Sequence, residues 1–153
     1  MKKPIDLKLT PEGFQKLVDE QKTLTERRPG VLKRMVDARE QGDLSENAGY
    51  HAAKEELGKI DSRLKVLKIM LRFADVVKAE GKSVVSFGNT VTVEVEGNQK
   101  DFTIVSALEA DPLAGKMSDI SPIGSALIGK KNGDVVNVDT PGGKVTYKIL
   151  NIS

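Results

Sequence analysis

The stretch AREQGDLSENA, residues 38–48, decides the fold because it separates two long segments that share one hydrophobic period. Upstream, core-type positions recur at alternating spacings of three and four, and they are Phe14, Leu17, Gln21, Leu24, Arg28, Val31, Met35 and Ala38. Downstream the same alternation runs through Tyr50, Ala53, Leu57, Ile60, Leu64, Leu67, Leu71 and Ala74. Such spacing is typical of heptad stripes on paired α-helices, and we call each stripe a seam.

Folding the two segments back on each other pairs Ala38 with Tyr50 at one end and Phe14 with Ala74 at the other. Both pairs place the turning point at residue 44. The two seams have matching lengths, so every position on one has a partner on the other. The pattern therefore predicts an antiparallel coiled-coil hairpin.

Local signals mark the ends of these helices. Thr10 can act as N-cap with Pro11 at the first helical position. Gly42 suits a helix C-terminus, and Asp43 or Ser45 can cap the second helix. These signals agree with the turning point that the seams predict.

Pro29-Gly30 conflicts with a regular helix, because an interior proline removes one hydrogen bond. The seam keeps its phase across this pair, which favours one kinked helix over two unrelated ones. The helical pattern extends to Ala79, so residues 1–80 are assigned to the hairpin, with its tip at 42–47.

Beyond the hairpin the hydrophobic period changes to two, which is typical of strands. The expected strands are Thr90–Val95, Phe102–Ser106, Val135–Asp139 and Val145–Leu150, with a short helix at Ser125–Lys130. Residues 81–153 are therefore expected to form a small α+β domain.

Composition excludes several classes of function. The chain has no cysteine and one histidine, which argues against disulfides, thiolate chemistry and histidine-rich metal sites. With 24 basic and 22 acidic residues, charge alone does not predict a free nucleic-acid binder or membrane binding. No apolar run reaches the length of a membrane span and no signal peptide is evident, so a cytoplasmic location is expected.

Two carboxylates, Asp43 and Glu46, lie three residues apart at the predicted tip. One interpretation is a capping box, in which both acids serve the second helix. The other is half of a magnesium site, since Mg²⁺ commonly takes one or two carboxylates and leaves its other positions to water and phosphate. The residues alone leave both interpretations open.

The run from Ala38 to Ala48, followed by YHAAKE at 50–55, resembles the hairpin-tip signature of the GreA transcription elongation factors, of the Gre transcript-cleavage family. Further matches follow in the family's order: Leu9-Thr10 to Gly13, Arg27 to Pro29, Phe87-Gly88, Glu109 to Asp111, Ser121-Pro122, Ala126 to Lys130, Gly133-Asp134 and Thr140 to Gly143. The resemblance covers nearly the whole chain.

This resemblance implies an FKBP-like second domain and a hairpin that enters the secondary channel of bacterial RNA polymerase. The protein would be an accessory factor rather than an enzyme, stimulating Mg²⁺-dependent cleavage of backtracked RNA in the polymerase active site. By similarity, Asp43 and Glu46 would help to hold a Mg²⁺ ion shared with the polymerase, with Ser45 in a supporting role. The nascent RNA 3′ end would be a further partner, and we expect a monomer.

Further candidates are weaker. Basic residues that could contact RNA along the hairpin are Arg27, Arg28, Lys33, Arg34 and Lys54, although a solvated helix face is an equal explanation. The resemblance assigns Ser121, Pro122 and Ile123 to a loop that touches the polymerase. His51 is interpreted as an exposed helix residue. Gly49 departs from the family, which usually has an acid there.

Two other functions remain possible on this sequence. A Gre-like regulator could occupy the channel without stimulating cleavage. Alternatively, the second domain could be a prolyl isomerase or chaperone, although Phe87, Phe102 and Tyr147 suit a small core better than an aromatic ligand pocket.

Overall fold

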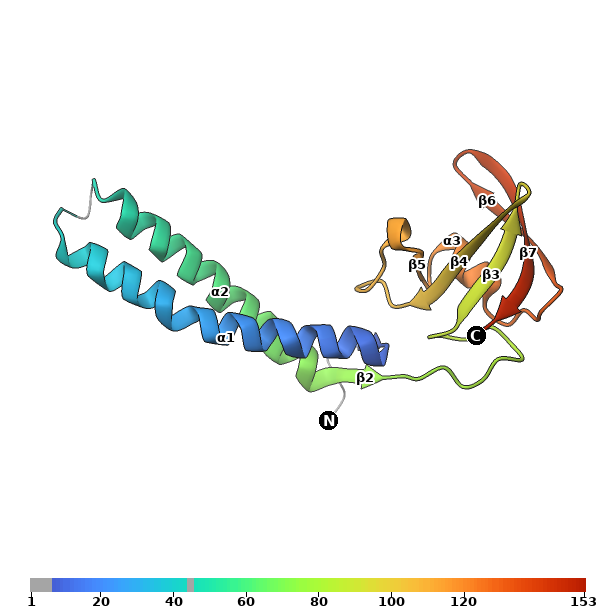
Figure 1. Cartoon of the computed structure of the whole chain (residues 1–153), viewed down its shortest axis with the longest axis horizontal. Coiled ribbons are helices and arrows are strands. Elements are labelled where there is room, and N and C mark those ends of the chain that lie inside the picture. Colours follow the sequence, from blue (N-terminus) through green and yellow to red (C-terminus); the bar gives the residue numbers. More distant parts are fainter. Residues whose placement is uncertain (1–6, 44–45) are drawn as a thin grey trace. The chain divides into compact units, whose positions relative to one another are not determined.

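The structure is a computed structural model that describes residues 7–43 and 46–153. It contains two compact units (Figure 1). Among the described residues, the first unit takes in Phe14–Ala74, and the second takes in residues 7–13 together with Asp75–Ser153. The boundary expected at residues 80–81 therefore lies inside the second unit.

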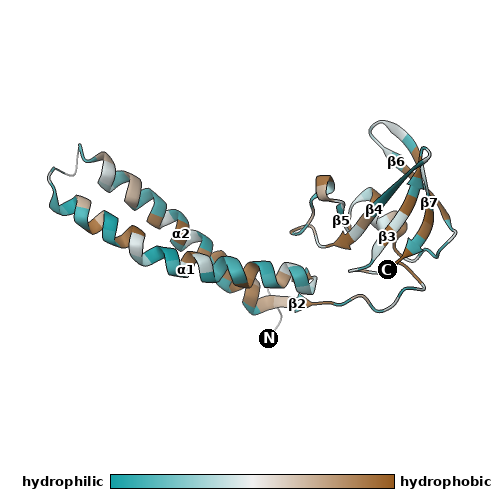
Figure 2. Ribbon diagram, in the orientation of Figure 1, coloured by the Kyte–Doolittle hydropathy of each residue, from teal (hydrophilic) through white to brown (hydrophobic). Residues whose placement is uncertain are grey.

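The first unit is a hairpin of two antiparallel helices, α1 (Pro11–Glu40) and α2 (Ala48–Phe73). Every predicted seam position is buried or half-buried, and the most enclosed are Val31, Ala53, Ile60 and Leu67, at 0 to 3% exposure. Both ribbons alternate between hydrophilic and hydrophobic bands along their length, as expected when one stripe of each helix faces the other (Figure 2). The predicted hairpin is confirmed.

The start and the continuity of α1 also match the prediction. The Thr10 hydroxyl accepts a hydrogen bond from the Gly13 backbone N–H at 3.0 Å, which is the expected N-cap. Pro29 lies inside a single uninterrupted helix. The predicted extension of the second helix to Ala79 is wrong, because α2 ends at Phe73 and the chain then forms strand β2 (Ala74–Val76). β2 pairs with β1 (Leu7–Leu9), so strand pairing between distant segments overrides the local helical pattern.

The second unit is built on a five-stranded sheet of order β5-β4-β3-β7-β6. Its strands are β3 (Thr90–Val95), β4 (Asn98–Val105), β5 (Lys116–Ser118), β6 (Val135–Thr140) and β7 (Gly143–Ile152). All neighbours are antiparallel except β4 and β5, which run parallel. A short 3₁₀ turn, η1 (Pro112–Ala114), precedes β5, and helix α3 (Pro122–Leu127) contacts β5 and β6.

The sequence placed four of these strands and missed β5. β4 begins at Asn98 rather than Phe102, because Glu96 and Gly97, both with positive φ, form a tight two-residue turn after β3. The short helix expected at Ser125–Lys130 is also displaced. Ser121 caps α3 by accepting from the Gly124 N–H, and Pro122 occupies the first turn, so the helix starts three residues earlier.

The core of the second unit lies between the sheet and α3, and it includes Val93, Ile104, Leu127 and Ile149, each 0% exposed. The unit also holds the segment that precedes the hairpin. The Glu109 carboxylate accepts hydrogen bonds from the Thr10 backbone N–H, at 2.9 Å, and from the Thr10 hydroxyl. These features confirm the predicted fold class, a helical hairpin followed by a small α+β domain.

Among the described residues, no helix combines the length and the apolar character needed to cross a membrane.

Candidate functional site

The connection between α1 and α2 carries the two candidate acids. The turn begins where the Gln41 N–H donates to the Ala38 carbonyl at 3.2 Å. Gly42 follows with φ of 153°, a backbone conformation that favours glycine and ends the helix, as predicted. Leu44, the predicted apex, and Ser45, the supporting candidate, lie outside the described residues.

Asn47, rather than Asp43 or Ser45, is the N-cap of α2. Its side-chain oxygen accepts from the Tyr50 N–H at 3.0 Å, and its backbone has the extended conformation usual at this position. The predicted caps were wrong because Asp43, Ser45 and Asn47 are all capable of capping, and local chemistry does not choose among them.

This result removes the capping-box interpretation of the two acids. In a capping box the acidic residue lies three positions after the cap, inside the first turn. Here Glu46 precedes the cap, and the first turn of α2 contains no acid. Asp43 and Glu46 both lie exposed on the connection between the helices. Their charges are therefore presented to solvent at the end of the hairpin.

Below the tip, a carboxylate joins two of the RNA-contact candidates across the helices. Glu56 of α2 accepts from Arg27 and, at 2.7 Å, from Arg34, both on α1. Hydrogen bonding to Arg34, reinforced by Arg27, lowers the pKa of the Glu56 carboxyl below its ordinary value. The two arginines therefore share one face of the hairpin.

The remaining candidates also have partners within the hairpin. Arg28 donates to Asp61 at 2.6 and 3.1 Å, and Lys33 donates to Asp37 at 2.8 Å. The Lys54 ammonium lies 5.9 Å from the centre of the Tyr50 ring. These contacts stabilise the helices, so a structural role accounts for all five residues, and contact with RNA stays a prediction.

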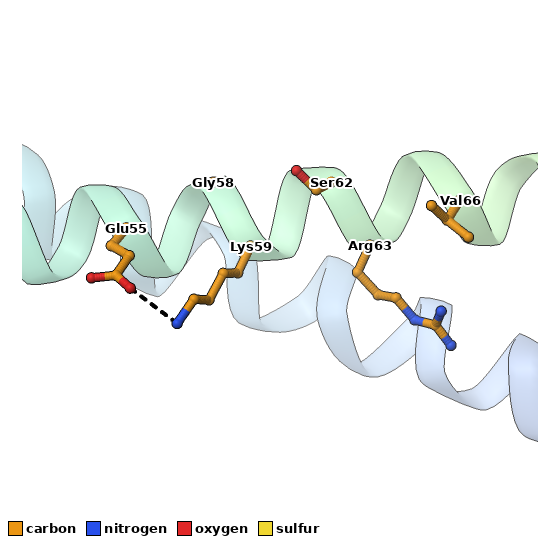
Figure 3. Close-up of a pocket in the computed structure, with 6 residues that line it drawn as sticks. All are labelled: Glu55, Gly58, Lys59, Ser62, Arg63 and Val66. Atoms are coloured by element: carbon orange, nitrogen blue, oxygen red, sulfur yellow. Dashed lines mark ion pairs between the residues drawn. The ribbon is translucent and has the colours of Figure 1, made fainter.

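His51 is exposed on α2, as expected, with its ring edge-on to that of Tyr50 at 5.4 Å between centroids. Farther from the tip, a shallow groove of about 550 Å³ lies on α2, lined by Glu55, Gly58, Lys59, Ser62, Arg63 and Val66 (Figure 3). Its charged members are already paired: Lys59 with Glu55 at 3.1 Å, and Arg63 with Glu20. The groove is open and contains no catalytic constellation among the described residues.

The three polymerase-contact candidates have different environments in the second unit. Ser121 donates to the Ser118 carbonyl at 2.6 Å and caps α3, and Ile123 packs against the core, so both have structural roles. Pro122 is exposed. The neighbouring Ile120 is 78% exposed, and sequence reasoning missed it although it adjoins the predicted loop.

The second unit offers a poor site for a prolyl isomerase. Phe102 and Tyr147 pack edge-to-face in the core at 6.0 Å, and Phe87 is 7% exposed. A surface groove of about 440 Å³ beside η1 has Phe102 as the one aromatic in its lining. Burial and the nearby Glu96 raise the pKa of Tyr147, which is consistent with a core residue.

The donor set at the tip fits part of a magnesium site. Mg²⁺ prefers oxygen ligands and often takes one or two carboxylates, completing its shell with water and phosphate. Asp43 and Glu46 supply such a pair, in an exposed position that a second macromolecule can reach. Within the described part of the chain, no cluster of three or more acidic, histidine or cysteine residues could hold a metal ion.

Comparison with known proteins covers both units. Residues 7–76 match the family model "Transcription elongation factor, N-terminal", and residues 80–153 match "Transcription elongation factor, GreA/GreB, C-term". The chain belongs to the GreA/GreB family of transcription elongation factors. Both units of this GreA/GreB-family factor, hairpin and sheet domain, are thus accounted for by one family.

Individual members of the GreA/GreB family are similar along almost the full length. Transcription elongation factor GreA of Macrococcus caseolyticus is 47% identical over 150 residues, with 95% of each chain covered. GreA of Bacillus subtilis is 46% identical over 149 residues, again with 95% of each covered. Among solved structures, the GreA factor homolog 1 (Gfh1) protein of Thermus thermophilus is 31% identical, with 97% of this chain and 99% of that chain covered and a TM-score of 0.46.

Proposed function

We propose that this elongation factor binds bacterial RNA polymerase and inserts the hairpin into its secondary channel, where Asp43 and Glu46 stimulate cleavage of backtracked RNA. The observation that carries the proposal is that both acids lie exposed at the end of the hairpin while Asn47 performs the capping. Two exposed carboxylates at the end of the hairpin are well placed to act on another molecule.

In this proposal the polymerase supplies the RNA and one metal site, and the factor supplies ligands. A Mg²⁺ ion bound there would lower the pKa of a coordinated water and so provide a nucleophile at neutral pH. Asp43 and Glu46 would hold their carboxylates toward that ion and balance its charge. The paired helices keep the acids at the end of the hairpin, and the nascent RNA 3′ end would lie against the same tip.

The second unit would contact the polymerase surface through the exposed residues around Ser121. Ile120 and Pro122 offer exposed apolar surface, while Ser121 and Ile123 hold the loop to the fold. Burial of exposed apolar side chains is a common source of affinity at protein interfaces. The factor would act as a monomer on one polymerase.

The test is a cleavage assay on backtracked polymerase complexes with Mg²⁺. Asp43→Asn and Glu46→Gln are each expected to reduce the release of short 3′ RNA fragments by at least about 100-fold, a loss typical of removing a group that acts in the transition state. Their binding to polymerase, measured by competition with labelled wild-type factor, should be unchanged. Glu40→Gln is the matched control, because it neutralises an exposed acid at the end of α1.

If the Asp43→Asn variant cleaves at the wild-type rate, the role proposed for the tip is wrong. Polymerase binding without any cleavage by the wild-type factor would instead support the non-cleaving regulator.

A further inference from the structure

Asn47 joins the two helices at the tip as well as capping one of them. Its side-chain N–H donates to the Ala38 carbonyl in the last turn of α1 at 2.5 Å, while its side-chain oxygen accepts from the Tyr50 N–H at 3.0 Å. The Ala38 carbonyl, which also accepts from the Gln41 N–H, has a second lone pair for this bond, and the first turn of a helix leaves backbone N–H groups without partners inside the helix. One amide therefore serves a carbonyl of α1 and an N–H of α2 at the same time.

Capping alone does not require asparagine at this position. Aspartate and serine cap helices about as well as asparagine, because the cap needs only an acceptor oxygen. The bond to Ala38 needs a donor as well, and a carboxylate has none. A serine hydroxyl can donate as well as accept, but it lies on a shorter side chain than the asparagine amide. The structure thus uses both halves of the asparagine amide, its oxygen for the cap and its N–H for the bond to α1.

The bond closes the connection that carries the acids. It ties Asn47 to Ala38, and a β-carbon built on Gly49 would lie 3.9 Å from that of Ala38, so the chains approach closely here. In the sequence, Asp43 and Glu46 both lie between Ala38 and Asn47, and Glu46 immediately precedes Asn47. Removing the tie would take away a hydrogen bond that fixes the two ends of this acid-bearing connection to each other.

We infer that Asn47 is a positioning residue for Asp43 and Glu46, setting where the tip presents its two carboxylates. The inference rests on the proposed function, since it concerns how the acids reach a reacting centre. Catalytic groups must be held within about 0.5 Å of their productive geometry. A misplacement of about 1 Å can cost about 100-fold in rate. The Asn47–Ala38 bond joins the two ends of the connection and so limits such misplacement.

The test compares Asn47→Asp and Asn47→Ser with Asn47→Ala, which loses both the cap oxygen and the amide. Aspartate keeps a cap oxygen and has no donor, and serine keeps a cap oxygen but replaces the amide N–H with a hydroxyl on a shorter side chain. Agreement between the serine and aspartate variants separates loss of the donor from added charge. Arg63→Gln is the matched control, because it breaks a cross-helix contact to Glu20, at 2.5 and 2.9 Å, far from the tip along α2.

Two readouts are used, one of them independent of cleavage. In the free full-length factor, ¹⁵N relaxation should give lower order parameters for the Asp43 and Glu46 amides in Asn47→Ser and Asn47→Asp, and unchanged values in Arg63→Gln. With backtracked polymerase, the maximal cleavage rate should fall about 10- to 100-fold in the first two variants. The factor concentration that gives half-maximal cleavage should stay the same.

The outcomes separate this inference from the proposed function. Wild-type order parameters and a maximal rate within twofold of wild type in Asn47→Ser and Asn47→Asp would overturn the positioning role, even if Asp43→Asn abolishes cleavage. Normal cleavage by Asp43→Asn would overturn the proposed function and the positioning role with it. A loss confined to Asn47→Ala, accompanied by a lower Tm, would show that capping alone matters and would also overturn the inference.

Discussion

Arg28 and Asp61 face each other across the hairpin and are joined by two hydrogen bonds, at 2.6 and 3.1 Å. Arg28 occupies a seam position that the heptad pattern reserves for an apolar residue, and it is half-buried there. Its aliphatic stem can cover the seam while the guanidinium reaches the flank of α2. Asp61 is the residue next to Ile60, the predicted seam partner of Arg28.

Asp61→Asn is expected to lower the melting temperature of the hairpin by less than about 5 °C, because partly exposed ion pairs contribute little. Arg28 and Asp61 are 40% and 46% exposed in their side chains. Circular dichroism at 222 nm measures the change, with Glu55→Gln as a control that breaks a more exposed pair on one helix. A fall larger than about 10 °C would show that the pair is a principal support of the hairpin.

The hairpin should lose stability in acid. Arg63 lowers the pKa of Glu20, Arg34 lowers that of Glu56, and Arg28 lowers that of Asp61. A lowered pKa in the folded state means that the stabilisation is complete above the ordinary carboxyl value, about 4, and is lost as the pH falls through the lowered values.

The melting temperature should therefore be level from about pH 8 to pH 5 and fall below about pH 4. A variant carrying Glu20→Gln, Glu56→Gln and Asp61→Asn should melt lower at pH 7 and show a smaller fall in acid. An equal fall in both proteins would assign the acid sensitivity to other carboxylates.

Substitution of Gly49 should stabilise the hairpin. Gly49 lies in the first turn of α2, and an added β-carbon would meet only ordinary contacts, 3.6 Å from Asn47 and 3.9 Å from Ala38. Gly49→Ala is expected to add up to about 1 kcal/mol through helix propensity. Gly49→Glu should add a further 0.3 to 1 kcal/mol, roughly, from a negative charge near the helix N-terminus. Thermal melts decide this, and a lower Tm for Gly49→Ala would contradict it.

Glu109 and Gly13 should behave as a coupled pair in the second unit. Glu109→Ala removes the acceptor of the buried Thr10 N–H and should cost about 1 to 3 kcal/mol. A β-carbon on Gly13 would lie 2.1 Å from a carboxylate oxygen of Glu109, so Gly13→Ala must displace that side chain.

Denaturant unfolding of the double variant measures this coupling. Gly13→Ala should destabilise the wild-type chain and be neutral or stabilising in the Glu109→Ala background, where the clash is gone and helix propensity improves. Equal effects in the two backgrounds would mean that the residues act independently.

Ile120→Ala should weaken polymerase binding about tenfold without changing the melting temperature. The side chain is 78% exposed, so it contributes little to folding, whereas its burial at an interface would be worth roughly 1.5 kcal/mol. Competition binding with labelled wild-type factor measures the affinity. Ile123→Ala is the contrasting variant, because Ile123 packs against the core and its loss should lower the Tm. If the Ile120→Ala variant binds polymerase with unchanged affinity, Ile120 does not contact the polymerase.

By itself the sequence determined the features that depend on neighbouring residues. Seam periodicity fixed the two helices and their approximate register, Thr10 and Pro11 marked the start of α1, and period-two runs located four strands of the sheet. Each of these signals is contained within a few turns or a single strand, so local propensity and hydrophobic pattern were sufficient.

Tertiary structure alone decided the features that join distant segments. It chose Asn47 as the cap, and the amide of that residue also reaches the Ala38 carbonyl. It ended α2 at Phe73 to form β2, placed β5 parallel to β4, and brought Glu109 to Thr10, 99 residues away. Several residues could satisfy each local requirement, and the long-range hydrogen bonds of the folded chain selected among them.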